Sequence, residues 1–372
     1  MRSRTLRPLV AALAGATAMA SLVLTSPEPA AAATKTFSMA QCSSVVNGVA
    51  RGCETPLEKI FIWLRPGDTL TIAPGTYDVG NLGVNTRLAD MTGRITITAA
   101  DPSRPPTLRG RVQLWKPRNV TLSNLRLEAT LAGSPALSSV CGTGWEVRNS
   151  HIFGASKTGS YSNFTIAGNA SDCPGEPRDF RVSENVFTDP YTDPTLHDHP
   201  DMSVRATAVI YHHIYATFNG TPGTGGVIER NVFVGNRNGA GVKLGNLKGE
   251  LGPANVRVRF NSFYDGVWAV LLAYDSRNHV IEGNLVDRMR GGPKSAYGAA
   301  VAVSELTTVS NTVANNYGYN VQKNWADLKT GSTVNEAANV LGPSPLYTGW
   351  LLQPTRPEAQ PYGRWGTGAF PG

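Results

Sequence analysis

The chain has 372 residues, of which 41% are hydrophobic and only 16% are charged. A disordered chain would be more charged and less apolar, and the 39 Gly and 25 Pro exclude a helical bundle because both residues break helix interiors. The net charge of +7 suits an anionic partner, but the chain has no Lys/Arg run of the kind that nucleic-acid binding needs. We therefore expect an ordered, loop-rich, all-β protein that does not bind nucleic acid.

Residues 1–33 are predicted to be a secretory signal peptide of the bacterial type. Three arginines lie within the first seven residues, an apolar stretch covers 9–24, and small residues at 31–33 form a cleavage site. A membrane anchor is the alternative, but the apolar stretch is short and two prolines follow it directly. We expect a secreted, extracellular protein without membrane contact, whose positive charge falls by two when the peptide is removed.

The cysteines predict two disulfides. All of them follow the signal peptide, at Cys42, Cys53, Cys141 and Cys173, and an even number in an oxidising compartment indicates pairing. Among the three connectivities we favour the local pairs Cys42–Cys53 and Cys141–Cys173. The absence of CxxC spacing argues against a thiolate metal site or a redox motif.

A repeat organises the middle of the chain, where alternating apolar residues lead again and again into an Asn. These segments end at Asn124, Asn149, Asn185, Asn231, Asn261, Asn284 and Asn316. Strands whose apolar residues alternate, each ending in a corner Asn that recurs after 23 to 46 residues, predict a solenoid. Asn tolerates the left-handed backbone at a corner, and stacked copies can hydrogen-bond in a ladder. The alternative, a β-sandwich, would show turns every 8–12 residues.

The two ends of this region resemble a known family. The segment LRPGDTLTIAPGTY (64–77) resembles the first-rung motif of right-handed parallel β-helix proteins of the pectate-lyase type, and 351–370 is similar to their capping tail. The resemblance implies an all-β, right-handed, single-stranded parallel β-helix with long loop insertions, forming one domain over 34–372. Its N-terminal cap would cover 34–63 and its capping tail 323–372. This scaffold carries lyases, hydrolases, epimerases and non-catalytic adhesins.

Five strands that follow the Asn corners are expected to form a binding sheet. They are NFTIA (163–167), HIYAT (213–217), GVKLG (241–245), AVLLA (269–273) and AVAVS (300–304). If their second residues point inward, their third residues share an outward column, namely Thr165, Tyr215, Lys243, Leu271 and Ala302. A flanking outward column would hold Asn163, His213, Gly241 and Ala269. Small residues would then leave an open trough around Lys243, Tyr215 and His213.

This trio suits removal of a proton next to a carboxylate, the first step of β-elimination from a uronate. A Lys beside another potential cation has a lowered pKa and can act as the base, and a Tyr beside a Lys could act equally well. The segment NGAGVKLG (238–245) is similar to the lysine motif of β-helix lyases that use a Lys base. In calcium-using members an acidic ligand lies close by, where this chain has Gly239, Ala240 and Gly241.

Further residues are expected to bind substrate. Arg205 would stabilise the developing enediolate, and Asn163, Asn219, Thr217 and His199 would contact the sugar. The insertion 189–201 carries several Asp and His; Asp198 and Asp201 could bind a hard cation, which leaves Ca²⁺ open as a cofactor. A transition-metal tract and a plain polar loop whose Asp residues cap turns are the other interpretations.

We therefore expect a monomeric polysaccharide lyase that cleaves an acidic, uronate-containing polysaccharide. A glycoside hydrolase that uses Asp275 and Glu305 is the rival enzyme, because both residues end neighbouring strands. A carbohydrate-binding β-helix without activity is the third interpretation, in which Lys243 is a solvated charge and Tyr215 a sugar-stacking platform. Serine-nucleophile chemistry has no support, because the chain contains no GxSxG motif.

Overall fold

The computed structural model describes residues 32–84, 92–168, 171–188, 211–236, 239–246, 250–289, 300–305, 310–321, 325–328, 332–349 and 351–366. These residues belong to one compact unit, Ala32–Gly372. No helix in these ranges is long and apolar enough to cross a membrane. The predicted signal peptide lies almost entirely outside the described residues and stays a prediction.

Eleven parallel strands, counted within the described ranges, form sheet A. They are β1 (Thr34–Phe37), β4 (Thr69–Ile72), β6 (Ile95–Ala99), β8 (Val120–Ser123), β11 (Glu146–Arg148), β14 (Arg178–Ser183), β17 (Gly225–Glu229), β20 (Val256–Arg259), β23 (Val280–Glu282), β26 (Asn311–Ala314) and β29 (Val334–Ala337). Each pairs in parallel with the next, so sheet A contributes one strand to every turn of the chain.

The second sheet begins with two long strands, β5 (Thr76–Val84) and β7 (Thr107–Trp115), and divides after β7 into two rows. Row B1 holds β9 (Arg126–Ala129), β12 (His151–Phe153), β15 (Val186–Thr188), β18 (Val232–Val234), β21 (Ser262–Gly266), β24 (Leu285–Met289), β27 (Tyr317–Val321) and β30 (Val340–Leu341). Row B2 holds β10 (Leu137–Val140), β13 (Ser162–Gly168), β16 (His212–Phe218), β19 (Ala240–Leu244), β22 (Trp268–Ala273), β25 (Val301–Glu305) and β28 (Ala326–Leu328).

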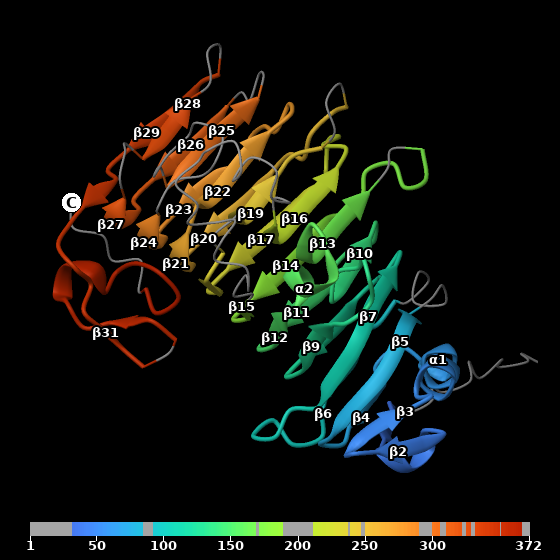
Figure 1. Cartoon of the computed structure of the whole chain (residues 1–372). Coiled ribbons are helices and arrows are strands. Elements are labelled where there is room, and N and C mark those ends of the chain that lie inside the picture. The colour runs from blue at the N-terminus through green and yellow to red at the C-terminus, as the bar shows by residue number, and fades with distance from the viewer. Residues whose placement is uncertain are drawn as a thin grey trace, which may run out of the picture. The chain divides into compact units, whose positions relative to one another are not determined.

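The chain passes repeatedly from sheet A to row B1 and then to row B2, so that each turn is a three-strand rung stacked on the one before. Figure 1 shows the strands of successive rungs lying side by side in chain order. Parallel crossovers of this kind are right-handed almost without exception, because of the twist of the strands. The chain is a right-handed, single-stranded parallel β-helix, and the predicted fold class is confirmed.

The start of the coil is covered by a small cap. A hairpin of β2 (Ser44–Val46) and β3 (Val49–Arg51) follows the 3₁₀ turn η1 (Met39–Gln41), and β3 also pairs with β5. Helix α1 (Glu54–Trp63) buries Leu57 and Phe61 against the first rungs. The short helix α2 (Ala155–Thr158) lies between β12 and β13, and β31 (Tyr347–Thr348), β32 (Gln353–Pro354) and the turn η3 (Pro357–Ala359) form the C-terminal segment.

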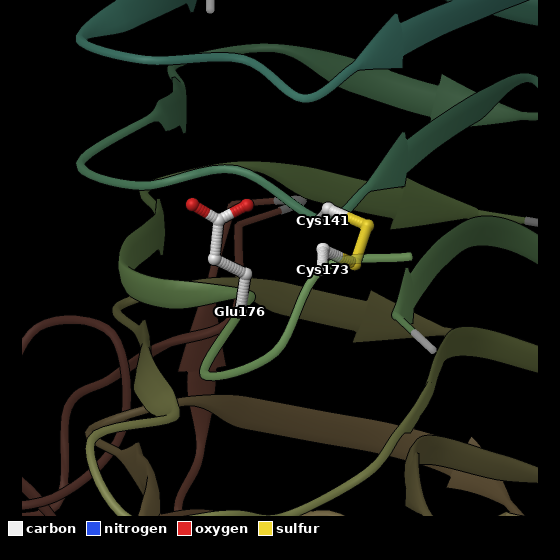
Figure 2. A group of neighbouring side chains, drawn as sticks. All are labelled: Cys141, Cys173 and Glu176. Carbon is white, nitrogen blue, oxygen red and sulfur yellow. A yellow bond between two sulfur atoms is a disulfide. The ribbon is translucent and has the colours of Figure 1, made fainter. Parts of the chain in front are cut away.

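The predicted disulfides are confirmed, with Cys42 bonded to Cys53 and Cys141 to Cys173. Figure 2 shows Glu176 beside the second disulfide. The carboxylate accepts hydrogen bonds from the Gly142 amide (2.9 Å) and the Thr143 hydroxyl (3.2 Å). The sulfurs of Cys141 and Cys173 and the Glu176 carboxylate lie close enough together to resemble a set of metal ligands, but both sulfurs belong to the disulfide. The disulfide and the hydrogen bonds of Glu176 therefore hold the loop 171–177 against the coil.

The predicted Asn ladder forms, with a shift at its beginning. Buried side chains donate amide hydrogen bonds in series, at 2.9–3.1 Å, along Asn185, Asn231, Asn261, Asn284, Asn316 and Asn339. In the earlier rungs, Asn124 and Asn149 lie one position before this column, and Ser150 stands in it below Asn185. The left-handed backbone also occurs one residue before the ladder, for example at Glu184 and Arg230, rather than at the ladder Asn itself.

Candidate functional site

The register of row B2 puts Tyr215 and Lys243 next to each other. Ile214 and Val242 are paired and fully buried, so the following residues, Tyr215 and Lys243, point outward from neighbouring strands. Both side chains are half-buried, and the Lys243 Nζ lies 4.3 Å from the centroid of the Tyr215 ring. The alternation of the sequence thus predicts the side-by-side position of this amine and this phenol correctly.

These two residues belong to an outer column that runs along row B2. In chain order its members are Gln113, Ser138, Thr165, Tyr215, Lys243, Leu271 and Ala302. Leu271 and Ala302 are buried in a small apolar cluster with Trp268, so the accessible part of the column ends at Lys243. Toward the N-terminus the column continues with the partly exposed Thr165, the buried Ser138 and the partly exposed Gln113.

His212 is a third group at this site, and it was not among the residues expected there. Its ring lies 5.8 Å from the Tyr215 ring, and its Nδ1 accepts a hydrogen bond from the Ala240 amide at 3.1 Å. Burial and, secondarily, the charge of Lys243 hold the pKa of His212 well below its usual range. The imidazole is therefore neutral and carries its proton on Nε2. The only sequence signal was its place in the His212–His213 doublet.

The Tyr215 phenol is linked to a chain of polar side chains. It hydrogen-bonds to Thr217, whose hydroxyl donates to Asn246 Oδ1 at 2.9 Å, and Asn246 in turn donates to Asn219 Oδ1 at 2.9 Å. Burial, with a smaller contribution from Glu250, raises the pKa of Tyr215, while Thr217 opposes the rise. The structure therefore places two of the predicted sugar-binding residues, Thr217 and Asn219, in a network that orients the phenol.

The predicted outward positions of His213 and Asn163 are wrong. His213 is 1% exposed and its ring lies 6.2 Å from Phe187 and 5.9 Å from Phe233, two residues of the core. Asn163 is fully buried and donates to His213 Nδ1 at 3.1 Å. Both lie at the corner between rows B1 and B2, where the bend turns this position toward the interior. Burial lowers the pKa of His213 to about 3, so it is a neutral residue of the corner and not a member of the outward cluster.

The glycines beside Lys243 also have a different role from the one expected. A Cβ on Gly241 would lie 2.5 Å from the Phe263 ring, and one on Gly245 would lie 2.8 Å from the Ala273 Cβ. They allow close packing at the corner and between rungs instead of opening a trough. Gly241 and its neighbours Gly239 and Ala240 offer no side-chain oxygen, so the residues before Lys243 do not fit a calcium site.

Several predicted residues lie outside the described part of the chain. Arg205, His199, Asp198 and Asp201 belong to this group, so their substrate-binding or cation-binding roles stay predictions. Of the rival hydrolase pair, Asp275 lies in the turn after β22, and the backbone of Glu305 pairs with Ala273. The Glu305 side chain is outside the described residues, and the pair stays an untested alternative.

A buried carboxylate on row B1, that of Asp287, contacts the C-terminal segment. Asp287 is 2% exposed and hydrogen-bonds to Tyr347 of the C-terminal segment. The Tyr347 ring packs edge-to-face on Tyr264 at 5.9 Å, and Arg288 lies 4.9 Å above the same Tyr264 ring. Burial raises the pKa of Asp287 to about 6, against the opposing effect of Arg288. This group fastens the C-terminal segment to the coil.

Comparison with known proteins finds likenesses of structure. No protein-family model and no curated protein matches the chain. An alginate lyase from Paenibacillus is similar at 16% identity over 82% of this chain and 98% of that one, with a TM-score of 0.44. A mannuronic-acid-specific family 6 polysaccharide lyase from the human gut microbiota has 15% identity over 82% and 74%, with a TM-score of 0.48. The A-module of a mannuronan C-5 epimerase from Azotobacter vinelandii has 12% identity over 82% and 100%, with a TM-score of 0.43.

The chain has a right-handed parallel β-helix fold. Strand pairing establishes the coil directly, through parallel ladders in sheet A and in both rows of the second sheet. A β-helix supports several reactions, so the activity has to be inferred from the side chains of this chain.

Proposed function

We propose that the protein is a secreted polysaccharide lyase that cleaves a uronate-containing polysaccharide by β-elimination. The observation that carries the proposal is the contact of Lys243 Nζ with the Tyr215 ring at 4.3 Å on the outer face of row B2. An amine and a phenol on neighbouring rungs are the two proton-transferring groups that an elimination needs. The positive net charge is compatible with a polyanionic substrate.

In the proposed reaction, the neutral Lys243 amine takes the proton from the carbon next to the uronate carboxylate. The electron pair left on that carbon forms the double bond and expels the glycosidic oxygen on the neighbouring carbon. That oxygen takes the phenolic proton of Tyr215. The raised pKa of Tyr215 keeps the phenol protonated at neutral pH, which suits a proton donor better than a base.

The surroundings of the pair support these roles. Neutral His212 lies beside Tyr215, and the Thr217–Asn246–Asn219 network holds the phenol in one orientation. In the free protein the ring face stabilises the ammonium form of Lys243. A sugar that enters between amine and ring would remove this stabilisation and bring its acidic C–H to the nitrogen.

A screen with two readouts tests the proposal. The protein is incubated with polygalacturonate, alginate, polyglucuronate and glycosaminoglycans, and both near-ultraviolet absorbance and reducing ends are followed. Elimination creates an unsaturated uronate that absorbs, together with new reducing ends. Reducing ends without absorbance would instead indicate hydrolysis, through Asp275 and Glu305 or the 189–201 insertion. Silence in both readouts on every polymer, with binding retained, would indicate a carbohydrate-binding protein.

A further inference from the structure

Strand β7 presents three alternating side chains on the same side. Arg111, Gln113 and Trp115 are at least partly exposed, whereas Val112 and Leu114 between them are 3% and 0% exposed and face the core. Alternate residues of a strand share a face, so a cation, an amide and an indole lie in one line. Trp115 is 37% exposed.

This line lies on the same face as the Tyr215–Lys243 pair. Gln113 pairs with Ser138, Ser138 with Thr165, and Thr165 with Tyr215, so β7 stands three rungs before Tyr215 and four before Lys243. Four rungs correspond to about 19 Å. The strands between contribute outward side chains of modest size, namely Ser138, Val140, Thr165 and Ala167. The column therefore leads from Lys243 to β7, and its buried position is Ser138, whose hydroxyl accepts hydrogen bonds from Arg111.

Arg111 has the electrostatics of an anion-binding group. Its guanidinium donates to the neutral Ser138 hydroxyl from Nε (3.4 Å) and Nη2 (3.3 Å). Ser138 lies on the next rung toward Tyr215, so the guanidinium points in that direction. No carboxylate among the described residues lies within ion-pair distance of it, whereas Arg109 on the same strand pairs with Glu128 at 3.3 Å. A half-buried guanidinium stays charged, and a carboxylate ligand would supply a counter-charge.

Trp115 completes the features of a sugar-binding position. The exposed face of an indole packs well on the C–H face of a sugar ring. Trp115 is the last residue of β7, and this end of the strand is held by two interactions. Lys116 Nζ donates to the Asp172 carbonyl at 2.9 Å, and the Cys141–Cys173 disulfide holds the loop that contains Asp172 against the next rung. The indole is thus carried by a rigid part of the coil.

We propose that Arg111, Gln113 and Trp115 form a remote subsite that binds an acidic sugar of the polysaccharide chain whose bond is cleaved at Tyr215 and Lys243. The proposal rests on the proposed function. One sugar of an extended chain is about as long as one rung, about 4.8 Å, so the subsite lies about four sugars from the cleaved bond. It would make the enzyme prefer long, charged chains over short ones.

Kinetics on oligouronates of defined length test the subsite. In Arg111→Gln and Trp115→Ala we expect KM to rise about tenfold on chains longer than about four sugars, because a charge-assisted hydrogen bond or a stacking contact is lost. On the shortest cleavable oligomer, KM and kcat should match the wild type. Two matched controls are used. Arg109→Gln removes a charge from the part of β7 that pairs with β9 of row B1, and Trp63→Ala removes the exposed indole at the end of α1.

Calorimetric binding in a Lys243→Ala background gives a second readout that does not need turnover. Polygalacturonate, polymannuronate and polyglucuronate are the probes, with dextran as the neutral control. We expect binding of a polyuronate to weaken about tenfold when Arg111→Gln is added and to stay unchanged with Arg109→Gln. Equal binding and equal chain-length dependence in both variants would overturn the subsite. Arg111-dependent binding without any unsaturated product from the wild type would instead keep the subsite and refute the lyase.

Discussion

Lys243 Nζ lies 4.3 Å above the centre of the Tyr215 ring, with the two residues on neighbouring rungs of the coil. This contact favours the ammonium form of the lysine, since the ring face attracts a cation. The same contact keeps the amine and the phenol within reach of a single sugar. The lysine is therefore an ammonium ion at rest, and it has to lose a proton to solvent as substrate displaces it from the ring before the amine can accept a proton from the sugar.

Replacing Lys243 by Arg separates a base from a mere positive charge. Arginine keeps the charge and the contact with the Tyr215 ring but does not lose its proton in proteins. We expect turnover of Lys243→Arg to fall about 100- to 10,000-fold, as far as that of Lys243→Ala. The measurement is the initial rate of absorbance increase, with Lys116→Arg as the control. Substantial activity in Lys243→Arg would reassign the lysine to charge stabilisation and make Tyr215 the base.

The network behind Tyr215 predicts a shift in the alkaline limb of the pH profile. Thr217 stabilises the phenolate, so Thr217→Val should raise the pKa of Tyr215 further. If the protonated phenol is the active form, kcat/KM should then remain high to a more alkaline pH, although its maximum falls as the phenol loses its orientation. Thr165→Val is the control, because Thr165 pairs with Tyr215 from the preceding rung. A limb that moves to lower pH in Thr217→Val would contradict the role of Tyr215 as the acid.

The coil and the Tyr215–Lys243 pair could be predicted because both depend on period-two alternation, which fixes the face of every residue in a regular strand. The same rule failed for His213 and Asn163, because both lie at the corner where row B1 turns into row B2 and the face is no longer set by parity. Asn246 was missed for a related reason. It follows β19 and reaches Thr217 only through the stacking of rungs, which no local pattern reveals.

The fastening of the C-terminal segment predicts a pH dependence of stability. The pKa of Asp287 is raised to about 6 in the fold, so the native state binds the proton more tightly than the unfolded chain, whose Asp titrates near 3.9. Stability should therefore fall as pH rises from about 4 through 6, by about 1–2 kcal/mol. In Asp287→Asn, thermal unfolding should lack most of this fall and should occur at a higher temperature at pH 7.5 than in the wild type. An unchanged pH slope would show that Asp287 is not the titrating group.

The Asn ladder should be a major source of stability in the coil. The Asn261 side chain donates to the Ile228 carbonyl and to Asn284, and it accepts from the Asn231 amide, all at 2.9–3.1 Å and fully buried. Asn261→Ala would leave these groups unpaired, at a cost of about 2–4 kcal/mol in the free energy of unfolding. Denaturant unfolding measures the loss, and Asn335→Ala on the exposed outer face of β29 should cost less than about 0.5 kcal/mol. Equal effects of the two variants would refute a special role of the ladder.

The central claim is that Lys243 and Tyr215 act as one unit, and a double-mutant cycle on the rate of unsaturated-uronate formation tests it most directly. Lys243→Ala and Tyr215→Phe should each lower kcat at least about 100-fold, and the double variant should be little slower than either one, since residues that act together lose their effect together. Full turnover in both single variants would place the reaction elsewhere on the coil.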